Sequence, residues 1–356
     1  MRNPFPLAVL IVSFPWIGAA VEPFPTDSCG VDAARFCQEG EPQGDKLARC
    51  LNEHTEELTD ACQAALSEYN ANRVWPDTVR TMVQGDLLRR YLIHLPRGYD
   101  GKTPLPVVLL FHGISGTPEI ARRQTRMSEV ADKRHFMVVY PEGIGGSWNA
   151  GKCCGQAIRD SVNDVGFVSD LLDQLQKNYP LDRSRVYAAG VDNGGMMVYR
   201  LAGELSRRLA AIASVGGTMV VDIPRAKRPV PVIEMHSIVK DRQVPFEGGP
   251  SKNPAFSGSL QPVPDTIAWW VKANYCRKKA AEVRTDLHFV TEVYKPAEGE
   301  PGAPVVLYKL MEGGPTWPDG KEVIHGWATG TLVQTVNASK IIWEFFKAHS
   351  LSSIPE

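Results

Sequence analysis

The chain has 356 residues, 43% of them hydrophobic, so it is long enough for one large α/β domain plus a small module. Its 39 basic and 40 acidic residues give a formal net charge of -1. This balance leaves no basic field for a nucleic acid and no charge run for a membrane surface. A neutral ligand, small or polymeric, fits such a surface better.

The first 20 residues have the layout of a secretory signal. One Arg precedes an apolar stretch from Leu7 to Ile17, and small residues follow it up to Ala20. That stretch is short for a membrane span, and an uncleaved anchor is the alternative. No other segment approaches the ~20 apolar residues that a span requires. We therefore predict a signal peptide at residues 1–20 and a secreted, soluble protein that does not enter the membrane.

Four of the seven cysteines fall within residues 27–66. In a secreted chain such a cluster predicts disulfides, because so small a module cannot bury enough surface to hold itself together. Helical periodicity is visible in "VDAARFC" and in "DKLARCLNEHTEELTDACQAAL", on either side of the breaker stretch "EGEPQGD". On one helix Cys50 and Cys62 would lie ~18 Å apart, beyond disulfide reach. An antiparallel helical hairpin then favours Cys29–Cys62 and Cys37–Cys50, and the spacing does not fit zinc knuckles.

The chain from residue 77 to residue 356, after a linker at residues 67–76, alternates apolar strands with amphipathic helices. Expected strands are "LLRRYLIHLP", "PLPVVLLFHG", "FMVVYPEG", "RVYAAG", "AAIASVGG" and "PVPVIEMHS", and expected helices are "VGFVSDLLDQLQKNY", "GGMMVYRLAGEL", "PDTIAWWVKANY" and "ASKIIWEFFKAH". Continuous apolar strands separated by helices imply a mainly parallel sheet with helices on both faces. The predicted fold class is α/β, of the α/β-hydrolase type.

The strand "RVYAAG" runs into its helix through Gly190-Val191-Asp192-Asn193-Gly194. This is the layout of a nucleophile elbow, in which serine hydrolases carry G-x-S-x-G. Here an aspartate stands at the tip. Either the chain uses Asp192 as a nucleophile or it no longer hydrolyses esters.

Several long segments resemble the secreted polyhydroxybutyrate depolymerase and feruloyl esterase family, from Leu88 to Leu351. They are "YLIHLPRGYDG", "VVLLFHGISG", "VVYPEGIGGSWNAGKCCG", "NDVGFVSDLLDQL", "LDRSRVYAAGVDNGGMMVYRLA", "GGPTWP" and "ASKIIWEFF". The N-terminal segments "CGVDAARFC", "CLNEH" and "ELTDAC" resemble one copy of the cysteine-rich repeat named after a Golgi glycoprotein. That second resemblance implies an interaction or packing role, with residues 27–66 as a surface for a protein partner or as a mere staple.

The family resemblance implies three catalytic positions, and two of them are substituted. The nucleophile position is Asp192, the acid position corresponds to Asp241 with Lys240 as a competing alignment, and the position of the base is Pro315. Proline has no titratable group, so the proton acceptor of the triad is missing. The nearest candidate for another base is His325, which is otherwise a solvated loop histidine.

The backbone donors of the oxyanion hole are expected to remain, because they do not depend on side chains. They would be the N–H of Gly113 or Ile114 together with that of Asn193, and the Asp192 carboxylate can itself accept them. Trp148 and Trp317 flank the motif loops, where they either stack on a sugar or aromatic acyl group or pack in the core.

The remaining cysteines leave two possibilities open. Cys153 and Cys154 form a vicinal disulfide, or one of them pairs with Cys276, and either way one thiol is left over. No metal set, Gly-rich nucleotide loop or internal repeat occurs in the sequence, so we expect neither a metal nor a cofactor.

Three functions follow, in order of preference. The first is a pseudo-esterase that binds a polyester or an ester-decorated polysaccharide without efficient hydrolysis. The second is an active carboxylic ester hydrolase with Asp192 as nucleophile and His325 as base. The third is a structural or interaction protein that acts through its cysteine-rich module.

Overall fold

The computed structural model describes residues 24, 26–37, 45–72, 76–222, 226–239, 241, 243–251, 256, 258–314, 316–320 and 335–353. The chain divides into two compact units, Met1–Val74 and Trp75–Glu356. The predicted signal peptide lies outside the described residues. Among the described residues, no helix has both the length and the apolar character needed to cross a membrane.

The small unit consists of short helices around a core that contains two disulfides. Its helices are α1 Thr26–Phe36, α2 Asp45–Glu53, the 3-10 turn η1 Thr55–Glu57 and α3 Asp60–Asn72. Cys29 is bonded to Cys62 and Cys37 to Cys50, with Cα–Cα distances of 4.7 and 6.0 Å. Both predicted pairings are therefore confirmed.

The single helix expected from Asp45 onward is interrupted. It stops at Glu53, passes through η1, and leaves the helical conformation at Leu58, which has φ -74° and ψ 154°. The new helix α3 then continues to Asn72, so most of the stretch predicted as a linker is helical. The break allows Leu58 to enter the core of this unit together with Leu51 and Leu66.

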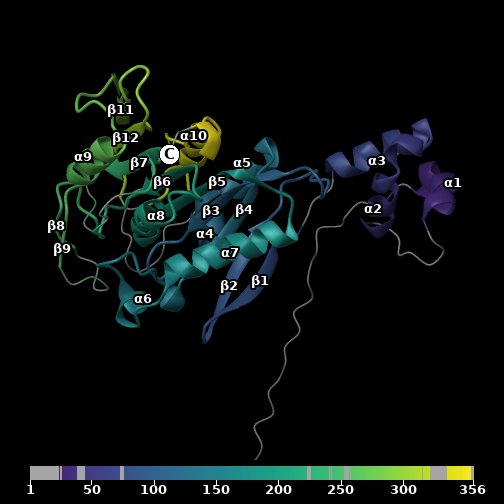
Figure 1. The fold of residues 1–356 in the computed structure, drawn as a ribbon, viewed down its shortest axis with the longest axis horizontal. Coiled ribbons are helices and arrows are strands. Elements are labelled where there is room, and N and C mark those ends of the chain that lie inside the picture. Colours follow the sequence, from purple (N-terminus) through teal and green to yellow (C-terminus); the bar gives the residue numbers. More distant parts are fainter. Residues whose placement is uncertain are drawn as a thin grey trace, which may run out of the picture. The chain divides into compact units, whose positions relative to one another are not determined.

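The large unit is built on one ten-stranded mixed sheet (Figure 1). Its strand order is β1-β2-β4-β3-β5-β6-β7-β12-β11-β10. The six strands from β4 to β12 in this order pair in parallel, and the strands outside them pair antiparallel. The predicted mainly parallel α/β-hydrolase-type sheet is confirmed.

The strands of this sheet are β1 Thr78–Gln84, β2 Leu87–His94, β3 Leu105–Phe111, β4 Met137–Pro141, β5 Leu181–Val191, β6 Ala211–Val215, β7 Val232–Ser237, β10 Glu282–Thr285, β11 Phe289–Tyr294 and β12 Val305–Leu310. The short strands β8 Gly249–Pro250 and β9 Ser259–Leu260 pair with each other. The helices are α4 Pro118–Thr125, α5 Met127–Arg134, α6 Gly155–Arg159, α7 Asp164–Asn178, α8 Asn193–Glu204, α9 Val263–Ala273 and α10 Ala338–Phe346. The 3-10 turns are η2 Ile144–Gly146 and η3 Leu351–Ser353.

Helices cover both faces of the sheet, as the continuous apolar strands require. On one face α7, α8 and α9 pack over a cluster that includes Phe167, Met197 and Trp270. On the other face α4, α5 and α10 pack over a second cluster, which includes Met127 and Phe346. Figure 1 shows α7 crossing the strands along one of these faces. The loops that follow the parallel strands meet at one edge of the sheet, where α/β proteins place their sites.

Cys153 and Cys154 are bonded to each other and both side chains are buried. Cys276 is a free thiol, which decides between the two pairings that the sequence left open. Burial raises the pKa of Cys276 to about 11, so this thiol stays protonated at neutral pH.

Candidate functional site

The turn between β5 and α8 has the geometry of a nucleophile elbow. Asp192 lies between the two elements with φ 52° and ψ -120°, a strained conformation for a residue that carries a side chain. Glycines on both sides make room for the turn: a Cβ at Gly190 would come within 2.3 Å of the Gly194 backbone, and one at Gly194 within 2.4 Å of the Phe111 carbonyl oxygen. The sequence G-x-D-x-G therefore folds into the sharp turn that a G-x-S-x-G motif forms, with a carboxylate at its tip.

The Asp192 carboxylate occupies its own anion cradle. The backbone N–H of Ile114 donates a hydrogen bond of 2.9 Å to Asp192 Oδ2, and the N–H of Asn193 donates to the same carboxylate. Burial raises the pKa of Asp192 to about 6, and the two N–H donors oppose this shift only in part. The charge of Asp241 raises the pKa further. Two backbone N–H donors from different loops thus converge on one point, and an internal side chain accepts them.

The two cradle donors are held by the loop that carries Trp148. The backbone N–H of Trp148 donates to Asn193 Oδ1 at 2.7 Å, and Asn193 Nδ2 donates back to the Trp148 carbonyl oxygen at 3.1 Å. The indole Nε1 of Trp148 donates to the carbonyl oxygen of His112 at 2.9 Å. Gly113, the other expected member of this site, lies so close that a Cβ there would be 3.1 Å from Asp192 Oδ2.

Neither candidate tryptophan is placed to stack on a ligand. Both Trp148 and Trp317 are fully buried. Trp148 packs edge-on against Phe111, and the Trp317 indole donates to Ser339 Oγ at 3.0 Å. Of the two alternatives for these rings, the structure therefore corresponds to core packing, because each indole N–H already has a protein partner.

His112 is engaged on both ring nitrogens and is no general base. Its Nδ1 lies 2.7 Å from the carbonyl oxygen of Gly113, which only accepts, while Nε2 accepts from the N–H of Gly143 at 2.9 Å. The ring is therefore neutral with its proton on Nδ1. Burial lowers the pKa of His112 to about 4, so the ring stays neutral at physiological pH.

Asp241, the predicted acid, is buried with one oxygen fully engaged. Its Oδ1 accepts from the N–H groups of Gln243 and Val244 at 2.9 and 2.8 Å. Its Oδ2 has no hydrogen-bond partner among the described residues and lies 3.7 Å from Nε2 of His236. Burial raises the pKa of Asp241, and the neighbouring imidazole opposes that shift.

His236 belongs to a buried polar chain behind Asp241. Its Nδ1 pairs with Glu234 Oε1 at 2.9 Å, and its Nε2 donates to the Val244 carbonyl oxygen at 2.7 Å. Tyr199 donates its hydroxyl to the other oxygen of Glu234 at 2.8 Å. Although burial works against the charged form, the contacts with Glu234 leave the pKa of His236 above its ordinary value. Both nitrogens of His236 face acceptors, so this ring has no lone pair to take a proton at Asp192.

The described part of the chain contains no histidine that pairs with Asp192. Its polar partners there are the backbone N–H groups of Ile114 and Asn193. The two remaining candidate positions, Pro315 and His325, lie outside the described residues. Ser237 at the end of β7 donates to the Gly313 carbonyl oxygen at 3.1 Å, which places the start of the Gly-Gly-Pro-Thr segment beside the strand that leads to Asp241.

Sequence reasoning missed one group of buried polar residues near this site. Arg89 and Asp164 form an ion pair in which both side chains are fully buried. The only sequence signals were an arginine inside the apolar strand "LLRRYLIHLP" and an aspartate at the start of the helix "DVGFVSDLL". No group of three His, Cys, Asp or Glu residues that can hold a metal occurs among the described residues.

Comparison with known proteins finds relatives among esterases, although no family model matches the chain. The chain is 29% identical over 68% of its length to the putative esterase NocK of Nocardia uniformis subsp. tsuyamanensis, and the match covers 74% of that protein. It is 26% identical over 67% of its length to feruloyl esterase B of Piromyces equi, and 25% identical over 62% to poly(3-hydroxyalkanoate) depolymerase C of Paucimonas lemoignei. The chain spans only about half the length of these last two relatives, 44% and 54%.

Among solved structures, acetyl xylan esterase from Aspergillus awamori has a similar fold. It superposes with a TM-score of 0.51 and 13% identity, over 76% of this chain and 99% of that one. At this identity the likeness concerns the fold alone. The chain is therefore similar in sequence to feruloyl esterases and to a polyhydroxyalkanoate depolymerase, and its large unit has the α/β-hydrolase fold of esterases.

Proposed function

We propose that this protein is a secreted pseudo-esterase, whose large unit binds a polyester or an ester-decorated polysaccharide without hydrolysing it efficiently. One observation carries the proposal: the Asp192 carboxylate stands at the nucleophile position and accepts the hydrogen bond of Ile114 N–H at 2.9 Å. This donor is the one that an esterase uses to stabilise the oxyanion of the substrate.

Acyl transfer requires three things at this place, and the described residues leave all three unmet. A hydroxyl must attack the acyl carbon, a base must take its proton, and a free cradle must bind the oxyanion that forms. Asp192 supplies no hydroxyl, and its partial negative charge lies where the oxyanion would develop. The family position of the base is Pro315, and none of the described histidines pairs with Asp192. An ester could then bind at this place, but among the described residues the groups that would hydrolyse it are missing.

The proposed secretion is supported by the cysteines and the N-terminal sequence, and the proposed ligand class by the relatives. The two disulfides of the small unit fit an oxidising compartment, and the predicted signal at residues 1–20 points the same way. The ligand class is inferred from the names of the relatives, which include a feruloyl esterase and a poly(3-hydroxyalkanoate) depolymerase. Fold and family do not fix function, so the ligand requires a binding test of its own.

The test is a reversion series measured on p-nitrophenyl acetate, with wild type, Asp192→Ser, Pro315→His and the double variant. We expect no turnover above background from wild type or either single variant, and a rise of roughly 10²-fold or more in the double variant. Sedimentation of the wild type with polyhydroxybutyrate granules or feruloylated xylan tests binding, with granule-free and xylan-free samples as controls. Robust turnover by purified wild type, or absence of binding to both polymers, would contradict the proposal.

The strained elbow favours one second candidate, in which Asp192 is itself a nucleophile. Asp192 has φ 52°, the strained conformation of a nucleophile elbow, although the residue is not a serine. In this case an Asp192 carboxylate oxygen attacks the acyl carbon, and the alkoxide leaves with a proton from the His325 imidazolium. The neutral imidazole then takes a proton from water, whose oxygen attacks the Asp192 carbonyl carbon of the mixed anhydride and releases the product carboxylate. The reaction then requires turnover by the wild type that His325→Ala abolishes, and 18O from labelled water in Asp192 after a single turnover.

A further inference from the structure

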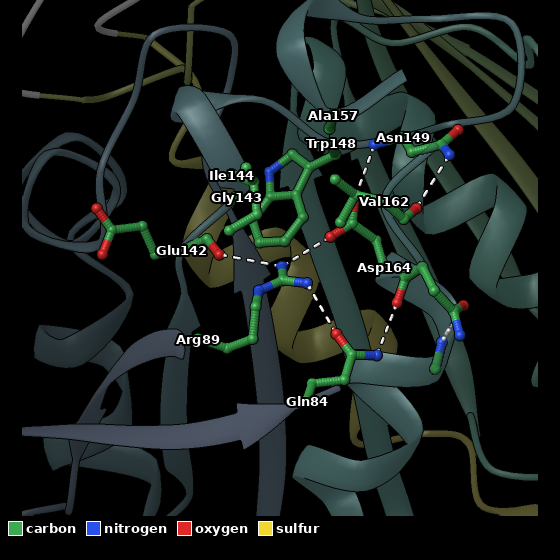
Figure 2. Close-up of polar contacts among 12 residues, drawn as sticks. Gln84, Arg89, Glu142, Gly143, Ile144, Trp148, Asn149, Ala157, Val162 and Asp164 are labelled. Atoms are coloured by element: carbon green, nitrogen blue, oxygen red, sulfur yellow. Dashed lines mark hydrogen bonds and ion pairs between the residues drawn. The ribbon is translucent and has the colours of Figure 1, made fainter. Parts of the chain in front are cut away.

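Arg89 on β2 and Asp164 at the start of α7 form a buried ion pair behind the loop that leads to Trp148 (Figure 2). Arg89 Nη2 lies 2.7 Å from Asp164 Oδ1, and both side chains are fully buried. The guanidinium also lies over the ring of Phe167, 3.8 Å from its centroid. An ion pair in such a place contributes little net stability compared with apolar residues of the same volume, because both charges lose their hydration. What apolar residues cannot supply is directed hydrogen bonding.

The directed bonds of the pair reach both ends of the segment Glu142–Asn149. Arg89 Nη2 donates to the carbonyl oxygen of Glu142 at 3.3 Å. Asp164 Oδ2 accepts from the backbone N–H of Asn149 at 2.8 Å. Gln84 on β1 accepts from Arg89 Nη1 at 3.2 Å, so a neighbouring strand fixes the guanidinium as well. The pair therefore holds the segment at its first and last residues.

The same segment holds both halves of the anion cradle. On the Ile114 side, Gly143 N–H donates to His112 Nε2 at 2.9 Å, and Ser115 N–H donates to the Gly146 carbonyl oxygen at 2.8 Å. On the Asn193 side, the two hydrogen bonds with the Trp148 backbone fix the first residue of α8. The segment thus hydrogen-bonds to Ser115, next to the donor Ile114, and to the side chain of Asn193, the other donor.

We propose that Arg89 and Asp164 are positioning residues, which set the segment Glu142–Asn149 and through it align the backbone N–H groups of Ile114 and Asn193 on one point. The pair touches no substrate and takes no part in bond making. Its role is to fix two N–H groups from different loops at the separation that one bound oxygen requires. The role concerns the geometry of the cradle, so it does not depend on which ligand the cradle receives.

The experiment is a pH titration of the backbone amides by NMR on the full chain. In the wild type, the Ile114 amide proton is expected to shift with a midpoint near the pKa of Asp192, about 6, because its hydrogen bond to Asp192 Oδ2 weakens when the carboxylate is protonated. In Asp164→Asn we expect the amplitude of this shift to fall by roughly half or more, since the donor moves away from the carboxylate. Arg89→Lys retains the charge but loses the fork to Gln84 and Glu142, and is expected to lose amplitude as well.

The control separates positioning from loss of stability. Phe346→Leu weakens the core on the other face of the sheet and serves as a control of reduced Tm. At a Tm similar to that of Asp164→Asn, it is expected to keep the full pH-dependent shift of the Ile114 amide. If Asp164→Asn fails to fold, Gln84→Ala removes a half-buried partner of the pair and tests the same prediction with a smaller change. Full amplitude at Ile114 in the folded variants, or an equal loss in Phe346→Leu, would overturn the proposal.

Discussion

The two units of this chain solve the same problem of stability by different means. The small unit has a core of few residues, in which Cys29 and Cys62 are fully buried beside Leu51 and Leu66, and two disulfides close its loops. The large unit buries two apolar layers against a ten-stranded sheet, and its one disulfide joins neighbouring residues. A large unit can thus be stabilised by its apolar core even when it also buries polar groups, whereas a small unit requires cross-links.

The first prediction tests how much the large unit depends on its buried polar pair. Replacing Arg89 by Met removes the charged partner of the fully buried Asp164 carboxylate. We expect the free energy of unfolding of the large unit to fall by about 3–5 kcal/mol. Urea unfolding followed by tryptophan fluorescence measures this change.

Lys152→Met is the matched control, since it breaks an ion pair with Asp222 in which both side chains are mostly exposed, 64% and 87%. Its expected cost is at most about 1 kcal/mol. Equal costs for the two variants would show that burial of the pair does not matter, and would remove the contrast between polar groups inside the sheet layers and those on the surface.

The second prediction concerns the cross-links of the small unit. Each bond restricts the unfolded chain, and the cost of losing it grows with the length of the loop it closes. Cys29 and Cys62 are 33 residues apart and Cys37 and Cys50 only 13, so replacing both members by Ser should cost about 4 kcal/mol for the first pair and about 3 kcal/mol for the second.

Hydrogen exchange on peptides from residues 26–37 and 45–72 measures both variants in the full chain, because it reports the small unit by itself. Peptides of the large unit serve as the internal control and are expected to keep their protection. Loss of protection throughout the large unit would mean that the two units do not unfold independently.

The sequence predicted the central strands because they are continuous apolar runs, as in "PVVLLF" at β3, where every residue is buried. It missed β12, a central strand in which the half-buried Tyr308 and Lys309 interrupt the apolar run "VVLYKL" before the buried Leu310. It also missed β10, at the edge of the sheet, and β11 beside it, because most of their side chains are partly or fully exposed and no apolar run marks them.

In the candidate site, too, some features could be predicted from the sequence and others could not. Glycine spacing predicted the elbow, because close backbone approach forbids a side chain at Gly190 and Gly194. No spacing rule predicts that Arg89 is fully buried, since arginine is mostly exposed in proteins and its partner Asp164 is 75 positions away. Hydrogen bonds between distant segments depend on the folded backbone, which a single sequence does not reveal.

The third prediction is a pH dependence of stability caused by Asp192. Burial raises its pKa from the ordinary 3.8 to about 6, so the folded state holds a proton more tightly than the unfolded state does. The contribution to stability is fully present below the lower value and is lost as the pH rises through the higher one. Asp192→Asn has no such group, and its free energy of unfolding minus that of wild type should increase by about 2 kcal/mol between pH 4 and pH 7.

Chemical denaturation at half-unit steps of pH measures the two curves. Asp241 and the buried groups behind it titrate in both proteins, so their contribution is expected to cancel in the difference except for the part due to their repulsion with Asp192. A difference that stays constant from pH 4 to pH 7 would mean that Asp192 is ionised as easily in the folded state as in the unfolded chain.

The smallest expected effect returns to the small unit, whose described residues include the buried carboxylate of Asp32. Asp32 on α1 is 2% exposed, and its Oδ2 accepts from the N–H and the hydroxyl of Thr59, at 3.1 and 2.7 Å, just before α3 begins. Asp32→Ala should cost about 1 kcal/mol, as the loss of a helix cap does, because Thr59 can turn to water at this partly buried place. Hydrogen exchange of residues 60–72 measures the loss, with the exposed Asp27→Ala as control. A loss near 3 kcal/mol in the free energy of unfolding would make this single carboxylate as important as a disulfide. The small unit would then depend on buried polar contacts as much as on cross-links, and the contrast with the large unit would not hold.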